Sequence, residues 1–500
     1  MIETSGWQRP PFNEPQVDAP TITRWLGKPW LVAIAWAAVI LTLGSGVLGG
    51  LHRGMNDEPD WRAFSRETGY VWEHRAIPPW TGMFGYLPGA FLALMPFTVW
   101  APRWLGVSLF VTANTLAAVG TAWLLYRWWW VQPAREAGRP TDGRLFVWPL
   151  FLMVAHFQHV LQGNQLTIGV LFLCVTGLTL VLQRRELTGG VLVGLAGCLK
   201  VTPFFLLVFF ALQRRWRAVW GLMLAILLFD VLPSCMFFGI DGAVREHSNW
   251  IRRVEWYSNH RFIEDPWLRI GRHGHEHNCS LAVVLTRWLR AAPTGDHQVV
   301  VFGDAPAAEI EAARAKLRSG EHLTVDPMPR DASPWSIGRY THSDRSKIPR
   351  FHAANWSAPI VWGIWIVLEA LVIGGILIAT AVSRRGPPNS ASFTAQAALW
   401  LILMLWPSPM VRDYYLALAL PACVVTWRAV LARSSQGPMT IGTRLAATAV
   451  FGSYVSVLCL SWDAANWYGV HLLTLVGLGM ASVWAGCNPE SVCRNTSTAS

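Results

Sequence analysis

The strongest constraint on the fold is the repetition of long apolar stretches along most of the chain. They recur from residue 29 to residue 486, and a helix that crosses a bilayer needs about 20 consecutive apolar residues. We therefore expect an all-α polytopic membrane protein rather than a membrane barrel, whose strands would show alternating hydrophobicity. The predicted helices lie near 29–50, 104–126, 145–161, 165–183, 216–238, 358–382, 394–411, 414–432, 444–462 and 467–486.

Composition excludes the main soluble classes. Only 14% of the 500 residues are charged and 53% are hydrophobic, whereas a soluble domain carries about 25% charged residues. The net charge of +11 comes from basic clusters between the apolar runs. This distribution follows the positive-inside rule of membrane proteins, so we expect no nucleic-acid partner. The 8 cysteines form no Cys-x-x-Cys pair, which argues against a zinc site or a disulfide framework.

The same basic clusters predict the orientation. Residues 1–28 form a cytoplasmic segment, 29–50 is a retained first helix, and 487–500 is a cytoplasmic tail. A catalytic membrane module is expected at 29–240, and further membrane helices are expected at 358–486. The outer face then receives the loop 51–85, the turn 162–165, the long segment 241–357 and the turn 407–415. Within 241–357, we expect residues 297–330 to form a small insert, with a strand at 299–302 and a helix at 305–318.

Two segments fit no simple span. Residues 86–100 are short and interrupted by proline, so we expect them to dip into the membrane or lie along it. Residues 187–212 carry Lys200 and Pro203 at their centre. We expect two half-helices that meet near Lys200. Broken backbone is tolerated at membrane depth only where it lines a cavity enclosed by protein, so the topology indicates a cavity.

Carboxylates in the loop 51–85 are candidate general bases. Asp57 and Asp60 follow the first helix by roughly two turns, and a carboxylate there can take a proton from an acceptor hydroxyl. The alternative is a solvated acidic loop that balances nearby arginines.

Basic side chains provide candidate phosphate ligands. Lys200 lies inside an apolar run, where a charge is costly and usually functional, although a lysine near an interface also extends towards water. Arg412 at the turn 407–415 can bind a phosphate through its planar guanidinium, or can pair with Asp413. The polar residues Asn164 and Gln165 either line a substrate cavity or join helices by hydrogen bonds.

Two further patterns have simpler alternatives. Asn278 precedes a helical pattern that contains Arg287, and an asparagine there caps a helix. His273, His275 and His277 alternate in a glycine-containing loop. Alternating histidines can chelate a metal, but the loop reads as flexible and no metal site is predicted.

Taken together, these motifs resemble glycosyltransferase family 87, in the GT-C superfamily of polyprenyl-phosphate-dependent membrane glycosyltransferases. The matching segments are Asp60-Trp61, Tyr86-Leu-Pro88, Gly163-Asn-Gln165, Lys200-Val-Thr-Pro203 with Gln213-Arg-Arg-Trp216, Asn278-Cys-Ser-Leu281 with Arg287, and Ser408 to Tyr415. Two features depart from the family pattern: Arg412-Asp413 stands where the family has a histidine-rich turn, and the 297–330 insert is not general to it.

The resemblance implies a GT-C-like bundle of roughly 10–12 membrane helices with a long outer loop. It implies a polyprenyl-phosphate monosaccharide donor, with a hexose such as mannose or a pentose, and a glycolipid or cell-envelope glycan acceptor at the outer face of the cytoplasmic membrane. Asp60 corresponds to the catalytic carboxylate, with Asp57 in reserve. Lys200 and Arg412 correspond to donor phosphate ligands, and Tyr86, Asn164, Gln165, Asn278 and Arg287 to substrate ligands. Neither a metal nor another cofactor is implied.

Three other functions remain open on the sequence. A polymerase or ligase of lipid-linked glycans also combines many helices with one long outer loop. A non-enzymatic transporter of lipid-linked sugars would carry broken helices in both halves of the chain, and here they occur in the first half. A binding protein that keeps the fold without turnover is the third, because fold alone does not establish function.

Overall fold

A computed structural model describes residues 21–78, 86–138, 142–258, 280–289, 297–302, 315, 335–340, 353–383, 390–406, 413–435, 439–458 and 470–487. Six helical segments in these ranges are long and apolar enough to cross a membrane: Pro29–Met55, Arg103–Glu136, Gly143–Gln162, Trp216–Phe238, Pro359–Ala381 and Tyr415–Ser434. Six shorter apolar helical segments accompany them. The expected all-α polytopic architecture is confirmed.

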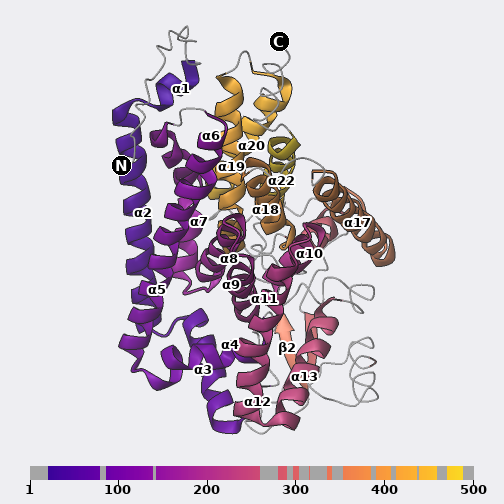
Figure 1. The fold of residues 1–500 in the computed structure, drawn as a ribbon. Coiled ribbons are helices and arrows are strands. Elements are labelled where there is room, and N and C mark those ends of the chain that lie inside the picture. The colour runs from indigo at the N-terminus through magenta and orange to yellow at the C-terminus, as the bar shows by residue number, and fades with distance from the viewer. Residues whose placement is uncertain are drawn as a thin grey trace, which may run out of the picture.

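Three helices stand side by side along one flank of the molecule (Figure 1). They are α2 (Pro29–Met55), α5 (Arg103–Leu124) and α7 (Val147–Gln162), and α2 packs against both of the others. The glycines of α2 allow this close approach. A Cβ on Gly50 would collide with the carbonyl oxygen of Leu161 on α7, so only glycine fits there.

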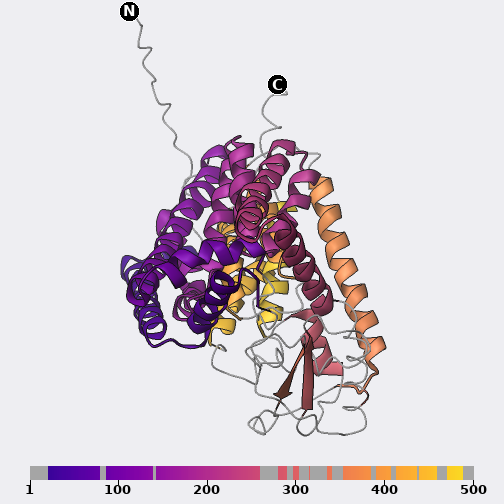
Figure 2. The same ribbon diagram turned by 90° about the horizontal axis from the view of Figure 1, so that it is seen from below.

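A second group of helices lies beside this flank. It contains α18 (Ser390–Leu403), α19 (Leu420–Ser434), α20 (Ile441–Leu458) and α22 (Val470–Cys487). The two groups share one large hydrophobic core, and α7 packs against α19 and α20. The long apolar helix α17 (Ala358–Ser383) runs along the outside (Figures 1 and 2).

Three buried polar side chains in the core form hydrogen bonds between distant segments of the chain. The indole of Trp129 donates to Thr179 at 3.0 Å, and the indole of Trp400 donates to Thr380 at 2.9 Å. The guanidinium of Arg428 donates to the backbone carbonyl of Trp129. A hydrogen bond inside an apolar environment is costly to leave unmade, so these pairs fix how the helices pack.

Short helices gather at the end of the bundle opposite α1 (Thr21–Leu26) (Figure 1). They are α3 (Pro59–His74), α4 (Pro88–Met95), α12 (Leu232–Phe238) and α13 (Ile240–Ser258). Both α3 and α4 carry a proline in the first turn, where its fixed φ suits a helix start and its missing N–H costs nothing. We call this the α3 end of the bundle.

The structure adds detail to three expected regions. The loop 51–85 contains α3, a helix with one apolar face, and the segment 241–357 begins with the equally amphipathic α13. The expected strand is present as β1 (His297–Phe302), which pairs antiparallel with β2 (Trp335–Tyr340) from His297↔Tyr340 to Phe302↔Trp335. The expected helix at 305–318 lies outside the described residues, except for residue 315.

Candidate functional site

The backbone breaks at Lys200, as the sequence predicts. Helix α9 (Glu186–Leu199) ends there, and Lys200 adopts an extended conformation with φ −156° and ψ 120°. The chain then continues through a short 3-10 turn that contains Pro203 into α10 (Phe205–Leu212). Arg215, just after α10, forms an ion pair of 2.6 Å with Glu186 at the start of α9. The two helices therefore form a hairpin with Lys200 at its tip.

The Lys200 side chain is buried, with 2% exposure. Its Nζ lies 3.4 Å from the hydroxyl of Thr167, at the start of α8 (Thr167–Leu182). The same Nζ lies 3.7 Å from the centroid of the Tyr415 ring. A cation above an aromatic face is attracted by the ring's quadrupole, more strongly when water is excluded. Lys200 therefore joins the hairpin tip to α8 and to the 3-10 segment Asp413–Ala419.

Asn164 and Gln165 form the turn that precedes Thr167. Asn164 adopts a left-handed conformation with φ 51°. Its N–H donates to the carbonyl of Leu161 and the N–H of Gln165 donates to that of Val160, which is the Schellman pattern that ends a helix. The Asn164 amide nitrogen also donates to the Gly50 carbonyl of α2 at 3.1 Å. Both side chains are buried, and Asn164 serves as a link between helices.

Tyr86 lies between this turn and α3. Its ring meets that of Phe64 edge to face, with centroids 6.0 Å apart. Tyr86 and Phe64 share one hydrophobic cluster with Trp61 and with Leu166 of the turn. Helix α4, which follows Tyr86, packs against α9. The candidate residues from the first half of the chain therefore collect at the α3 end.

Asp57 and Asp60 lie on either side of the start of α3. Asp60 is the second residue of α3, next to the buried Trp61. Asp57 precedes α3 with φ 55°, and its carboxylate lies 3.5 Å from Arg62 and 3.7 Å from Arg103. The backbone carbonyl of Asp57 also accepts from Arg62 at 3.0 Å. Asp57 therefore connects the start of α3 to the start of α5.

The remaining predicted residues are only partly covered. Arg287 is buried within α15 (Leu281–Leu289), with 1% exposure, and α15 packs on α17. Asn278, Arg412 and the alternating residues His273, His275 and His277 lie outside the described residues. Within the ranges that the structure covers, no group of three or more His, Cys, Asp or Glu residues is arranged to hold a metal ion.

Sequence reasoning missed a buried carboxylate at the same end. Asp230 is 1% exposed, and its Oδ1 accepts from the Gly89 N–H of α4 at 2.7 Å. Its Oδ2 lies 2.9 Å from Nε2 of His247 on α13. A Cβ on Gly89 would press against the Asp230 backbone. The available signal was the lone acidic residue in the apolar run 216–238, because a charge at such depth is costly.

The His247 ring is held between two acceptors. Its Nδ1 lies 2.8 Å from the Ala243 carbonyl, which can only accept, and Nε2 faces the Asp230 carboxylate. Both nitrogens therefore carry hydrogen when the pair is formed. The hydrogen bond to Asp230 raises the pKa of His247 above its usual value, with further increases from Ala243 and Glu246, while burial opposes them. Asp230 lies in the π-helical segment Leu227–Val231, so its two contacts tie this segment to α4 and α13 beside the α3 region.

One known family matches part of the chain. Residues 84–316 match the family model of glycosyltransferase family 87. No curated protein and no solved structure matches the chain. The family-87 match confirms the resemblance seen in the sequence and, with the apolar helices, supports a membrane glycosyltransferase in general.

The family-87 match covers the hairpin and most of its neighbours. It includes Tyr86, the turn at Asn164, the tip at Lys200 and the Asp230–His247 pair. Asp60 and Arg412 fall outside the matched residues. Within the described residues, the buried Lys200 ammonium and the buried amides of Asn164 and Gln165 lie towards the same end of the bundle.

Proposed function

We propose that the chain transfers a monosaccharide, a hexose such as mannose or a pentose, from a polyprenyl-phosphate donor to a glycolipid or cell-envelope glycan. The reaction is placed at the α3 end, which we assign to the outer face of the cytoplasmic membrane, with the N-terminus in the cytoplasm. Residues 29–240 would be the catalytic module, 241–357 the outer segment and 358–486 the supporting helices. The observation that carries the proposal is the buried Lys200 ammonium at the tip of a broken hairpin.

Lys200 is suited to a phosphate that departs from the sugar. Its described contacts include the Thr167 hydroxyl and the Tyr415 ring, which lie at the hairpin tip. A fixed cation aimed at developing negative charge is among the largest contributions to catalysis. The lipid tail of the donor would remain in the bilayer while its phosphate reached the hairpin tip. Arg412 would supply a second cation from the turn 407–415.

Asp60 would act as the general base. Its carboxylate takes the proton from an acceptor hydroxyl, the hydroxyl oxygen bonds to the anomeric carbon, and the bond from that carbon to the phosphate oxygen breaks. The products are the glycosylated acceptor and a polyprenyl phosphate whose added charge is balanced by Lys200. Tyr86, Asn164, Gln165, Asn278 and Arg287 are proposed to bind the substrates. No metal or other cofactor takes part in this scheme.

The test is transfer from a panel of radiolabelled polyprenyl-phosphate sugars to endogenous lipid in membranes. Wild type is compared with Asp60→Asn at equal expression. The matched control is Asp241→Asn, which removes an exposed carboxylate of α13, also at the α3 end. We expect transfer by wild type and the control and at least a hundredfold loss in Asp60→Asn. Full transfer by Asp60→Asn would overturn the assignment of the base.

A further inference from the structure

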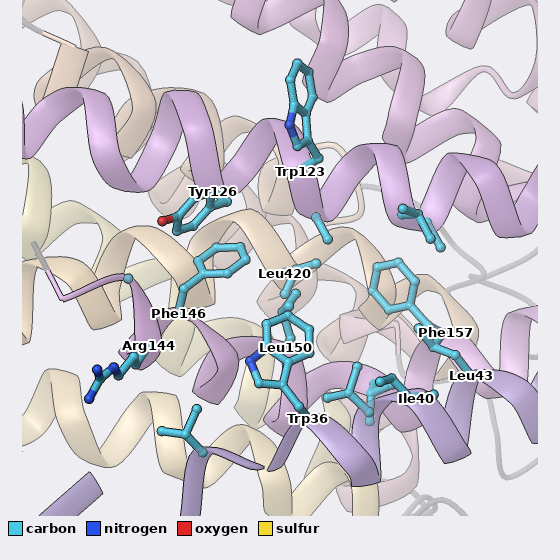
Figure 3. A pocket seen from close by; sticks show the side chains of 17 residues that line it. Trp36, Ile40, Leu43, Trp123, Tyr126, Arg144, Phe146, Leu150, Phe157 and Leu420 are labelled. Carbon is cyan, nitrogen blue, oxygen red and sulfur yellow. The ribbon is translucent and has the colours of Figure 1, made fainter. Parts of the chain in front are cut away.

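An elongated apolar groove opens on the flank formed by α2, α5 and α7 (Figure 3). Its volume is about 610 Å³, within the range of sites that hold drug-sized ligands. Its floor includes the buried side chains of Leu150, Phe157 and Leu420. Its rim includes Ile40 and Trp123, which are 64% and 53% exposed. The groove is therefore closed towards the core and open on the outer side of the helices.

The groove matches one leaflet of a bilayer in length. Along α2 it is lined from Val32 to Leu43, which at about 1.5 Å per residue spans roughly 16 Å. Half of the hydrocarbon core of a bilayer is about 15 Å thick. Both α2 and the segment that contains α7 are of membrane-spanning length. The groove thus has the length of one extended acyl chain within a single leaflet.

One end of the groove is polar. Arg144 and the Tyr126 side chain lie together there, while Phe157 and Leu43 lie at the other end (Figure 3). The Tyr126 hydroxyl lies against Gly143, next to Arg144, since a Cβ on Gly143 would come within 2.6 Å of it. Arg144 is exposed, so its guanidinium is accessible at this end of the groove.

The groove is separate from the candidate site along α2. The lining residues of α2 belong to its first half, towards α1, whereas α2 reaches the α3 end through Gly50 and Gly54. The polar end of the groove thus points away from Asp60 and from the hairpin tip. A donor whose phosphate is at Lys200 would not place that phosphate at Arg144.

We propose that this groove binds an anionic glycerophospholipid from the leaflet at the α1 end. One acyl chain would lie along α2 and α7, and the phosphate would accept hydrogen bonds from Arg144 and Tyr126. Lipid tails are as apolar as the groove, so apolar contact alone does not select an occupant. Selection comes from the charged end, where an arginine favours a phosphate. The site is independent of the transfer reaction.

The test titrates purified, delipidated full-length protein with dioleoyl phosphatidylglycerol or dioleoyl phosphatidylcholine, and counts bound lipids by native mass spectrometry. We expect the anionic lipid to bind about fivefold more tightly at one site. This is the gain in affinity expected from one partly exposed ion pair. Arg144→Glu should remove that preference. Arg135→Glu is the matched control, because Arg135 is also exposed but does not line the groove.

A second variant tests the groove itself. Ala122→Trp places a bulky side chain in it and should remove the site for both lipids, with helicity unchanged by circular dichroism. Equal binding of the two lipids by wild type would overturn the proposal, as would an unchanged number of sites in folded Ala122→Trp. Displacement of phosphatidylglycerol by a lower concentration of undecaprenyl phosphate would also overturn it, because the groove would then hold a polyprenyl chain.

Discussion

The Nζ of Lys200 lies 3.7 Å from the centroid of the Tyr415 ring. This contact joins the tip of the α9–α10 hairpin to the second half of the chain, three residues after Arg412 in the sequence. If Lys200 stabilises a departing phosphate, Lys200→Met should lower sugar transfer about a hundredfold or more, because it removes the charge and keeps an unbranched side chain. Lys200→Arg should retain part of the activity.

The same membrane transfer assay measures this effect. The control is Lys28→Met, which removes a lysine at the start of α2, at the other end of the bundle. Transfer by Lys200→Met at the wild-type rate, with equal protein in the membrane, would contradict a role for Lys200 in the reaction.

Asp57 is expected to be structural. Its ion pairs with Arg62 and Arg103 involve partly exposed side chains, so Asp57→Asn should cost less than about 1 kcal/mol of stability. Asparagine tolerates the left-handed conformation of Asp57, so the backbone should not change. We expect near wild-type transfer and a slightly lower Tm in detergent. A loss of transfer equal to that of Asp60→Asn would move the base to Asp57.

The turn at Asn164 permits a paired stability test. Asn164→Gly keeps a residue that accepts φ 51° and loses the hydrogen bond to Gly50, at a cost of about 1 kcal/mol. Asn164→Ala loses the same bond and adds roughly 1 kcal/mol of left-handed strain. The Tm of the alanine variant should therefore be the lower of the two. Equal Tm values would show that the turn relaxes.

The Asp230–His247 pair predicts a pH-dependent stability. Because the folded state raises the pKa of His247, the pair contributes fully below the unfolded value of about 6.5, and its contribution is lost as pH rises through the raised pKa. The Tm difference between wild type and His247→Gln should thus be larger at pH 6 than at pH 9. Asp230→Asn should remove that pH dependence. A difference independent of pH would contradict the pairing.

The contact between α9 and α11 (Trp216–Ile226) predicts a position that accepts no side chain. A Cβ on Gly190 would collide with the backbone of Ala218, and the helices would have to separate. Gly190→Ala should cost about 1–3 kcal/mol, as overpacking does. Gly374→Ala in α17 is the control, since nothing lies within 4 Å of the added Cβ and alanine favours a helix. Thermal unfolding in detergent should show a lower Tm for Gly190→Ala and an unchanged Tm for Gly374→Ala.

The sequence allowed the apolar helices and the break at Lys200 to be predicted, because both follow from local hydropathy and from proline chemistry. The start of α2 at Pro29 and the interruption around Pro203 are of this kind. Helix α3 was expected only as an outer loop. Its apolar residues, such as Trp61, Phe64 and Val71, are too widely spaced to resemble a span, and they become buried only through tertiary packing, for example against Phe110 of α5.

Relationships between distant residues were beyond the sequence. Nothing local indicates that Asp230 accepts from Gly89 or that it faces His247. The proximity of Lys200 to Tyr415 likewise depends on how two halves of the bundle pack. The residue types of a site can be read from charge at membrane depth, but the pairings follow from tertiary structure.

The hairpin around Lys200 constrains how the protein is made. Its arms have 14 and 8 residues, or about 21 Å and 12 Å of helix, short of the roughly 30 Å core of a bilayer. Neither arm can act as an independent membrane anchor during synthesis. The two must enter the bilayer together from one side, and the Glu186–Arg215 ion pair closes their base. If synthesis pauses between the two arms, the intermediate is only half inserted. Its Lys200 then has no protein around it.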